Sequence, residues 1–296
     1  VERAAAAGAP THLLALYRAI GAAELDQQVF PGALFRTAPH LGDQLDLWRI
    51  RHLLRLGAID EALPIIDREL ASPRAPEAWP YASIAWRLIG DDRHKWLEGD
   101  PGLVQIFDLE NDLPKLDELG DTLRRLHVAK GEYVDQSVRG GTQTDGPLLC
   151  RIDPLIRKTR AAIVGSVTDY LARLAPIDAL HPLLGPRRDR RIRFSGSWSV
   201  KLRGGGRHSN HVHTQGWISS ALYISLPKRD PNEIKEAGWF TIGEPQDELG
   251  INLPPQRKIE PAAGHLVLFP SWMWHGTIPF AQGERLTIAF DVRPPI

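Results

Sequence analysis

Residues 193–202 read RFSGSWSVKL. The larger apolar side chains of this stretch share one parity, as they do on one face of a β-strand: Phe194, Trp198, Val200 and Leu202. Further strand-like runs occupy 218–226, 238–242, 264–269 and 286–292. Glycines and prolines separate these runs, and short strands punctuated in this way predict a sandwich or a jelly roll. We therefore expect residues 191–296 to form one β domain.

The first 130 residues have a different period, because their apolar side chains recur at the intervals of a helix face. Paired helices with small residues such as Gly57 at their turns resemble tetratricopeptide-type hairpins, and a plain helical bundle is the alternative. Residues 131–190 are expected to form a connecting loop, polar and glycine-rich at 135–146, and then a support helix at 153–174. The predicted fold class is α+β. The helices expected in the first region lie at 45–56, 60–70, 77–89 and 116–126.

Composition excludes several classes of protein. The 36 basic residues balance the 36 acidic ones, so no overall charge favours nucleic acid. No apolar run is long enough to predict a membrane span. Cys150 is the one cysteine, which favours a reducing cytoplasm, and its apolar neighbours predict a buried structural thiol. The chain begins at Val1 without a methionine, so we expect it to be a fragment or a trimmed form.

The chemistry is concentrated in histidines of the β domain. His208, His211 and His213 fall within six residues, and His275 follows 62 residues after His213. Imidazole is a standard ligand for iron, zinc and copper. Two histidines at i and i+2 on a strand point to one face, and a third from a distant strand can close the same side of a metal. Such a site keeps positions open for a chelating cosubstrate and O₂.

An arginine and a threonine follow the last of these histidines. Arg285 lies ten residues after His275, and Thr287 shares its parity. A 2-oxo acid needs a cation for its distal carboxylate, and arginine can bind a carboxylate in a bidentate manner. Thr287 can add a hydroxyl donor to the same group.

These strings resemble the 2-oxoglutarate/iron(II) dioxygenases, whose signature is His-X-Asp/Glu, a distal His and then Arg-X-Ser/Thr. More closely, the chain is similar to a branch of 2-oxoglutarate oxygenases with an N-terminal tetratricopeptide-like region. The similar strings are SVRGGTQT (137–144), GWISS (216–220) and LFPS (268–271). The resemblance implies a double-stranded β-helix for residues 191–296, with iron(II) and 2-oxoglutarate as cofactors. It makes His211 the first metal ligand, His275 the distal ligand, Arg285 the 2-oxoglutarate anchor and Thr287 its helper.

Position 213 departs from the family, which has a carboxylate where this chain has His213. His213 can ligate and give a three-histidine site. It can swing away and leave water or a halide in its place, or His208 can replace it. We predict the ligand set His211, His213 and His275, and we predict that these three residues and Arg285 are catalytic.

The resemblance implies hydroxylation of a peptide or protein side chain, with release of succinate and CO₂. Helical hairpins build concave binding surfaces, so we expect the substrate to dock through the helical region. The alternatives are a three-histidine dioxygenase that does not use 2-oxoglutarate, and a non-catalytic interaction protein with a decayed barrel. Tyr223 is predicted to reach the cosubstrate, with core packing as its alternative. Arg139, Gln143 and Trp217 are predicted to touch substrate, although the loop that holds Arg139 and Gln143 could instead brace the two domains.

Overall fold

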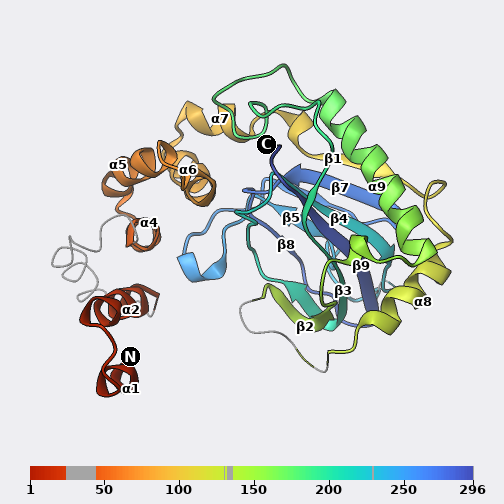
Figure 1. Cartoon of the computed structure of the whole chain (residues 1–296), viewed down its shortest axis with the longest axis horizontal. Coiled ribbons are helices and arrows are strands. Elements are labelled where there is room, and N and C mark those ends of the chain that lie inside the picture. Colours follow the sequence, from red (N-terminus) through yellow and green to blue (C-terminus); the bar gives the residue numbers. More distant parts are fainter. Residues whose placement is uncertain (25–44, 130, 132–135, 229, 296) are drawn as a thin grey trace. The chain divides into compact units, whose positions relative to one another are not determined.

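The structure is a computed structural model that describes residues 1–24, 45–129, 131, 136–228 and 230–295 (Figure 1). Residues 25–44 of the predicted helical region, residues 130 and 132–134, and residue 135, the first of the predicted loop, lie outside the described residues. The chain divides into two compact units. The first is Val1–Trp96 with Gln246–Asn252, and the second is Leu97–Pro245 with Leu253–Ile296. The three-segment division expected above stays a prediction.

The first unit is helical. Its elements are α1 (Glu2–Ala6), α2 (Thr11–Glu24), α4 (Asp46–Arg55), α5 (Ile59–Leu70), α6 (Ala75–Ile89), most of α7 (Asp92–Glu98) and the 3₁₀ turn η4 (Asp247–Leu249). Helix α4 packs on α5, and α5 packs on α6. Gly57 connects α4 to α5 with a φ of 72°, a conformation that suits glycine. The helical N-terminal part is confirmed, whereas the tetratricopeptide-like classification stays a prediction.

Apolar burial stabilises this helical unit. Ile50 of α4, Ile66 of α5 and Trp86 of α6 are at most 2% exposed. Full burial of an isoleucine is worth roughly 1.5–3 kcal/mol. The carboxylate of Asp46 is also buried, and it forms ion pairs with Arg49 and Arg68 at 3.0 and 2.6 Å. No helix in the described part of the chain combines the length and apolar character that crossing a membrane requires.

The second unit contains the sheets. Its helical elements are η2 (Pro101–Leu103), α8 (Leu116–Leu126), η3 (Leu148–Cys150) and α9 (Pro154–Arg173). Its strands are β1 (Gln105–Asp108), β2 (Val138–Gln143), β3 (Phe194–His208), β4 (Ile218–Ser225), β5 (Phe240–Ile242), β6 (Arg257–Ile259), β7 (His265–Pro270), β8 (His275–Thr277) and β9 (Glu284–Val292). Asp153 caps α9 by accepting a hydrogen bond from the backbone of Leu155 at 2.9 Å. Helices α8 and α9 lie beside the large sheet in Figure 1.

Within the described residues, the strands form two antiparallel sheets. The major sheet has six strands in the order β1-β7-β4-β9-β3-β2, and the minor sheet has three in the order β6-β5-β8. Strand β4 is buried between β7 and β9, and all of its residues except Ser225 are buried. This arrangement of mixed helix and antiparallel sheet confirms the predicted fold class, a helical region followed by a double-stranded β-helix.

The prediction of a loop at 135–146 is wrong for its central part, because β2 pairs with β3 there. The glycines that indicated a loop instead permit close strand contact. A Cβ at Gly141 would lie 2.5 Å from the carbonyl oxygen of Lys201. Gly140 adopts a φ of 67°, and the register of β2 on β3 shifts at this point. The segment is therefore a glycine-containing bulged strand at the edge of the major sheet.

The prediction that Cys150 is buried is also wrong. Leu148 and Leu149 are buried, but the short 3₁₀ turn that they begin leaves the thiol of Cys150 exposed. In the run Leu148-Leu149-Cys150, the two leucines are therefore buried and the cysteine is exposed.

Candidate functional site

The backbone places His211 and His275 directly opposite each other. His275 begins β8 of the minor sheet, and His211 pairs with it in an isolated β-bridge. The backbone N–H of His213 donates to the carbonyl oxygen of Ser271 at 2.9 Å. The expectation that His211 and His213 both lie on a strand is wrong, because β3 ends at His208 and the chain turns at Gly216 before β4 begins.

The three predicted metal ligands nevertheless converge. The ring centroids of His211 and His275 are 4.2 Å apart, and His213 lies 5.0 Å from the first and 5.1 Å from the second. One ligand atom from each residue lies within 4.8 Å of the other two. His208 is not in this group, and its ring stacks 5.6 Å from that of His211.

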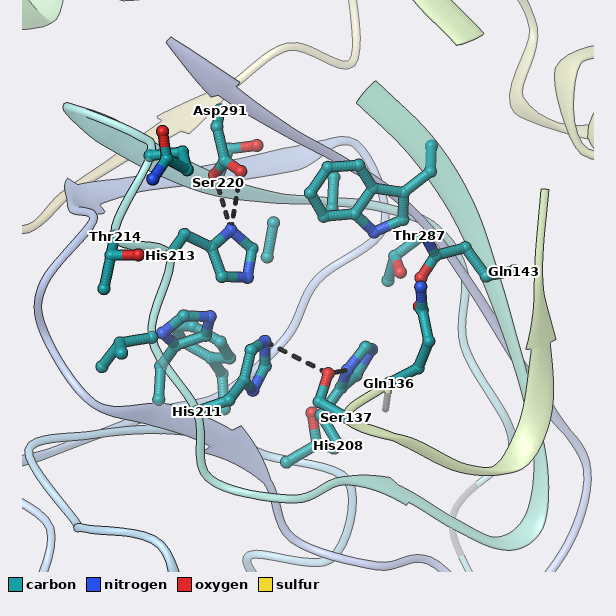
Figure 2. A pocket seen from close by; sticks show the side chains of 18 of the residues that line it. Gln136, Ser137, Gln143, His208, His211, His213, Thr214, Ser220, Thr287 and Asp291 are labelled. Carbon is teal, nitrogen blue, oxygen red and sulfur yellow. Dashed lines mark hydrogen bonds and ion pairs between the residues drawn. The ribbon is translucent and has the colours of Figure 1, made fainter. Parts of the chain in front are cut away.

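The hydrogen bonds of the three rings fix their tautomers. Nδ1 of His211 lies 2.8 Å from the carbonyl oxygen of Ser209, and Nδ1 of His275 lies 2.9 Å from that of Met273. Nδ1 of His213 lies 2.7 Å from each carboxylate oxygen of Asp291. Figure 2 marks these two contacts with dashed lines. Carbonyl and carboxylate oxygens only accept, so each Nδ1 must carry the proton. Each Nε2 is then unprotonated, which is the form that binds a metal, and the Nε2 of His211 also lies 3.2 Å from the Ser137 hydroxyl, which can donate to it (Figure 2).

Burial keeps the central histidines neutral. It holds the pKa values of His211 and His275 well below the ordinary value, and the neighbouring histidines act in the same direction. Burial likewise lowers the pKa of His208 to about 3, with Arg285 and His213 adding to the effect. At neutral pH these rings therefore need to lose no proton before they bind a cation.

Arg285 has unused hydrogen-bonding capacity. It is 3% exposed, and among the described residues its Nε and Nη1 atoms have no hydrogen-bond partner. Its guanidinium carbon lies 5.0 Å from the ring centroid of Tyr223, whose own hydroxyl is also unpartnered. Burial lowers the pKa of Arg285, but a guanidinium remains charged in proteins. A buried cation with free donors requires an anion, and the carboxylate of a 2-oxo acid meets that need.

One cavity joins these groups. Its volume is about 460 Å³, within the range of small-molecule sites. Both sheets contribute to its walls, since β8 supplies His275 and β9 supplies Arg285 and Thr287. The remaining lining residues are Gln136, Ser137, Gln143, Trp198, His208, His211, Val212, His213, Thr214, Gln215, Ser220, Ala221, Phe240, Thr277, Ala289 and Asp291. The residues present therefore fit a metal ion and a dicarboxylic acid in the same cavity.

The structure brings only some of the residues predicted to touch substrate to the cavity. Gln143 lines the cavity, but Arg139 and Trp217 are not among the described residues of its wall. Arg139 is exposed, and its guanidinium donates to the carbonyl oxygen of Val138 at 2.9 Å. Trp217 is buried, and its indole N–H donates to the carbonyl oxygen of Leu183 at 3.2 Å. Tyr223 lies against Arg285 rather than on the cavity wall.

Sequence reasoning missed Asp291, although its position in the chain carries a signal. Residues 285, 287, 289 and 291 share one parity on β9, and all four line the cavity. A face that holds Arg285 and Thr287 must continue to Asp291, because side chains alternate along a strand. The contact with His213 spans 78 residues, so only the folded chain shows it.

Comparison with known proteins gives one family match. Residues 196–291 match the family described as "Putative 2OG-Fe(II) oxygenase". This segment contains the three histidines, Arg285, Thr287 and Asp291. A search of curated proteins found no match.

Solved structures of low sequence identity resemble the chain. A Pseudomonas putida prolyl-4-hydroxylase is 16% identical with a TM-score of 0.43, and the match covers 66% of this chain and 94% of that one. A viral collagen prolyl hydroxylase from Paramecium bursaria Chlorella virus-1, solved with 2-oxoglutarate, is 15% identical with a TM-score of 0.43, covering 67% and 99%. A prolyl hydroxylase from Trichoplax adhaerens, in complex with a hypoxia inducible factor peptide fragment, is 15% identical with a TM-score of 0.44, covering 71% and 93%. At such scores the likeness says nothing about what this chain binds.

Proposed function

We propose that this chain, whose residues 196–291 belong to the 2OG-Fe(II) oxygenase family, hydroxylates a peptide or protein side chain and releases succinate and CO₂. The family match makes the chain an oxidoreductase with iron(II) and 2-oxoglutarate as its cofactors. One observation supports the site assignment above all others. Three histidines that each offer a ligand nitrogen converge in the same cavity that holds a buried arginine with two unpartnered nitrogens.

The residues of the cavity have two roles, to hold the metal and to bind 2-oxoglutarate. His211, His213 and His275 would hold iron(II) through Nε2, because their Nδ1 atoms are already occupied. Arg285 would bind the distal carboxylate of 2-oxoglutarate with its free N–H groups, and Thr287 beside it on β9 would donate its hydroxyl. When bound, iron and 2-oxoglutarate together supply the oxidation of a C–H bond by O₂.

The chain's own contribution is orientation and exclusion of water. The β-bridge between His211 and His275 holds two rings in place through the backbone. The aromatic ring of Phe240 lies 5.8 Å from that of His275, and Phe269 lies 4.7 Å from it, so apolar groups back the site. Tyr223 covers one side of the Arg285 guanidinium. Apolar groups behind the ligands lower the local dielectric and so strengthen the polar contacts that form beside them.

The cavity wall supports a peptide as substrate. Gln136, Gln143 and Gln215 line it together with Trp198. A glutamine amide offers both donors and an acceptor, which match the N–H and C=O groups of a peptide backbone. Trp198 adds an apolar face for a side chain. We also propose that the helical first unit recruits the substrate, since stacked helices form extended binding surfaces.

The test is a coupled assay on the full chain with iron(II), 2-oxoglutarate and a diverse peptide library. We expect stoichiometric succinate and a mass gain of one oxygen atom on the modified peptide. Arg285→Ala serves as the matched negative control. If 2-oxoglutarate and metal bind but no peptide gains oxygen, the substrate belongs to another class. If 2-oxoglutarate does not bind at all, the oxygenase assignment itself is overturned.

A further inference from the structure

The three histidines differ in what holds their Nδ1 atoms. His211 and His275 each donate to a neutral backbone carbonyl, whereas His213 donates to the carboxylate of Asp291. Among the described residues of the cavity wall, Asp291 is the one carboxylate. The difference falls on position 213, where the resemblance described above expects an acid instead of a histidine. The carboxylate of Asp291 thus places a negative charge on this side of the site. It lies behind the His213 ring, whereas a carboxylate at position 213 would contact the metal directly.

The carboxylate of Asp291 is built into the fold. It is 8% exposed and accepts a hydrogen bond from the Ser219 hydroxyl at 2.6 Å. Ser219 in turn lies 2.9 Å from the hydroxyl of Ser271. A Cβ at Gly216 would lie 2.5 Å from the Ser271 Oγ and 3.2 Å from the Asp291 Cβ, so only glycine leaves room for this packing. Ser219, Ser271 and Gly216 therefore surround Asp291 and hold its carboxylate against the imidazole of His213.

We propose that Asp291 is a positioning residue that acts on the metal through His213, an inference that rests on the proposed function. It fixes the Nδ1–H tautomer of His213 and increases electron donation from Nε2. It also supplies from behind the imidazole the negative charge that a carboxylate at position 213 would supply directly. Partners of this kind typically change metal affinity by about 10–100-fold when they are removed.

The charges of the loaded cavity agree with this role. Iron(II) carries two positive charges and 2-oxoglutarate two negative ones, so these cancel. Arg285 adds one positive charge, and Asp291 adds the one negative charge that balances it. Without Asp291, three neutral imidazoles and an arginine would surround the metal and the cosubstrate with an uncompensated positive charge, which is costly where little water enters.

The first experiment is a cobalt(II) titration of the metal-free full chain, followed by the visible absorption of the bound ion. We expect Asp291→Asn to weaken cobalt binding by about 10–100-fold, because asparagine can still accept from Nδ1 but carries no charge. Asp46→Asn is the matched control, since it removes a buried carboxylate in the helical unit that does not line the cavity. Unchanged affinity and spectrum in Asp291→Asn overturn the proposal while leaving the oxygenase assignment intact. A wild type that binds no cobalt overturns both.

The second experiment moves the charge. His213→Asp alone would set two carboxylates against each other, so it should bind cobalt poorly. The double variant His213→Asp/Asp291→Asn keeps one carboxylate and should bind more tightly than His213→Asp. A purely structural Asp291 predicts the reverse order, because two damaging substitutions would then add. Weaker binding by the double variant, or its failure to fold, counts against the proposal.

Discussion

His211 and His275 exchange two backbone hydrogen bonds, each 3.0 Å long, across an isolated bridge between segments 64 residues apart. Because the main chain makes this contact, the two rings do not depend on each other for their placement. Loss of one imidazole therefore removes a ligand without moving the opposite segment.

We expect His211→Ala and His275→Ala each to abolish turnover and to weaken iron binding, with little change in the secondary structure. Each substitution removes one of three nitrogen ligands. Isothermal titration with iron(II) under anaerobic conditions and an assay of succinate release measure the two effects. His265→Ala at the start of β7 is the control, since it does not line the cavity. More than half of the activity in either ligand variant would contradict the assignment.

Arg285→Ala should raise the concentration of 2-oxoglutarate required for half-maximal turnover far more than it weakens iron binding. The lost contact is a charge-assisted hydrogen bond, worth about 1.5–3 kcal/mol, or roughly ten- to a hundredfold in affinity. Arg203→Ala on neighbouring β3 is the control, because that side chain is exposed and does not line the cavity. An unchanged 2-oxoglutarate requirement in Arg285→Ala would place the anchor elsewhere.

His213 and His208 can be distinguished by paired variants. The three-histidine geometry predicts that His213→Ala loses iron, whereas His208→Ala keeps metal affinity because its Nδ1 contacts Ser137 and its ring lies outside the ligand group. The visible spectrum of the anaerobic iron(II)–2-oxoglutarate complex reports the change. Wild-type affinity and spectrum in His213→Ala would rule out the three-histidine centre and leave water or His208 in the third position.

His127, which is not one of the proposed metal ligands, should make the stability of the protein depend on pH. Burial lowers its pKa to about 4, and nearby Lys201 acts in the same direction. Its two nitrogens lie 2.9 Å from the Thr142 hydroxyl and 3.1 Å from that of Ser199. The unfolded chain takes up a proton near pH 6.5, but the folded chain does so only near pH 4.

The free energy of unfolding should therefore fall as the pH drops from about 6.5 to about 4. The slope due to His127 should stay below about 1.4 kcal/mol per pH unit, because the ring is partly exposed to solvent. Urea unfolding of the metal-free protein across this range measures it. His127→Gln should have a shallower pH dependence than the wild type, and an equal slope would show that the ring is protonated in the folded state.

Periodicity in the sequence predicted the regular elements closely. The helix expected at 116–126 is α8 over Leu116–Leu126, and the strand expected at 218–226 is β4 over Ile218–Ser225. Both elements bury a continuous face, so local pattern and tertiary packing agree. The short strands β6 and β8 have three residues each, too few to show a period, and pairing with β5 alone defines them.

The site, like the fold, was predictable from the sequence in some parts and not in others. Histidine spacing and the Arg285–Thr287 parity identified residues that the fold brings into one cavity. Trp217, predicted to touch substrate, is not among the described residues of the cavity wall, and its indole N–H instead donates to the carbonyl oxygen of Leu183. Asp291 could not be paired with His213 from the sequence, since nothing local specifies which strand lies beside the turn after His213.

The three fixed tautomers also bear on metal selection. A set of neutral nitrogen ligands ranks divalent ions by the Irving–Williams order, in which nickel, copper and zinc all stand above iron. The site therefore cannot choose iron by affinity, and the ion that it receives depends on which one is available where the chain folds. Zinc in the same position has no redox chemistry. Because the same nitrogens suit both ions, we expect zinc to compete with iron for this histidine group and to lower turnover where it binds.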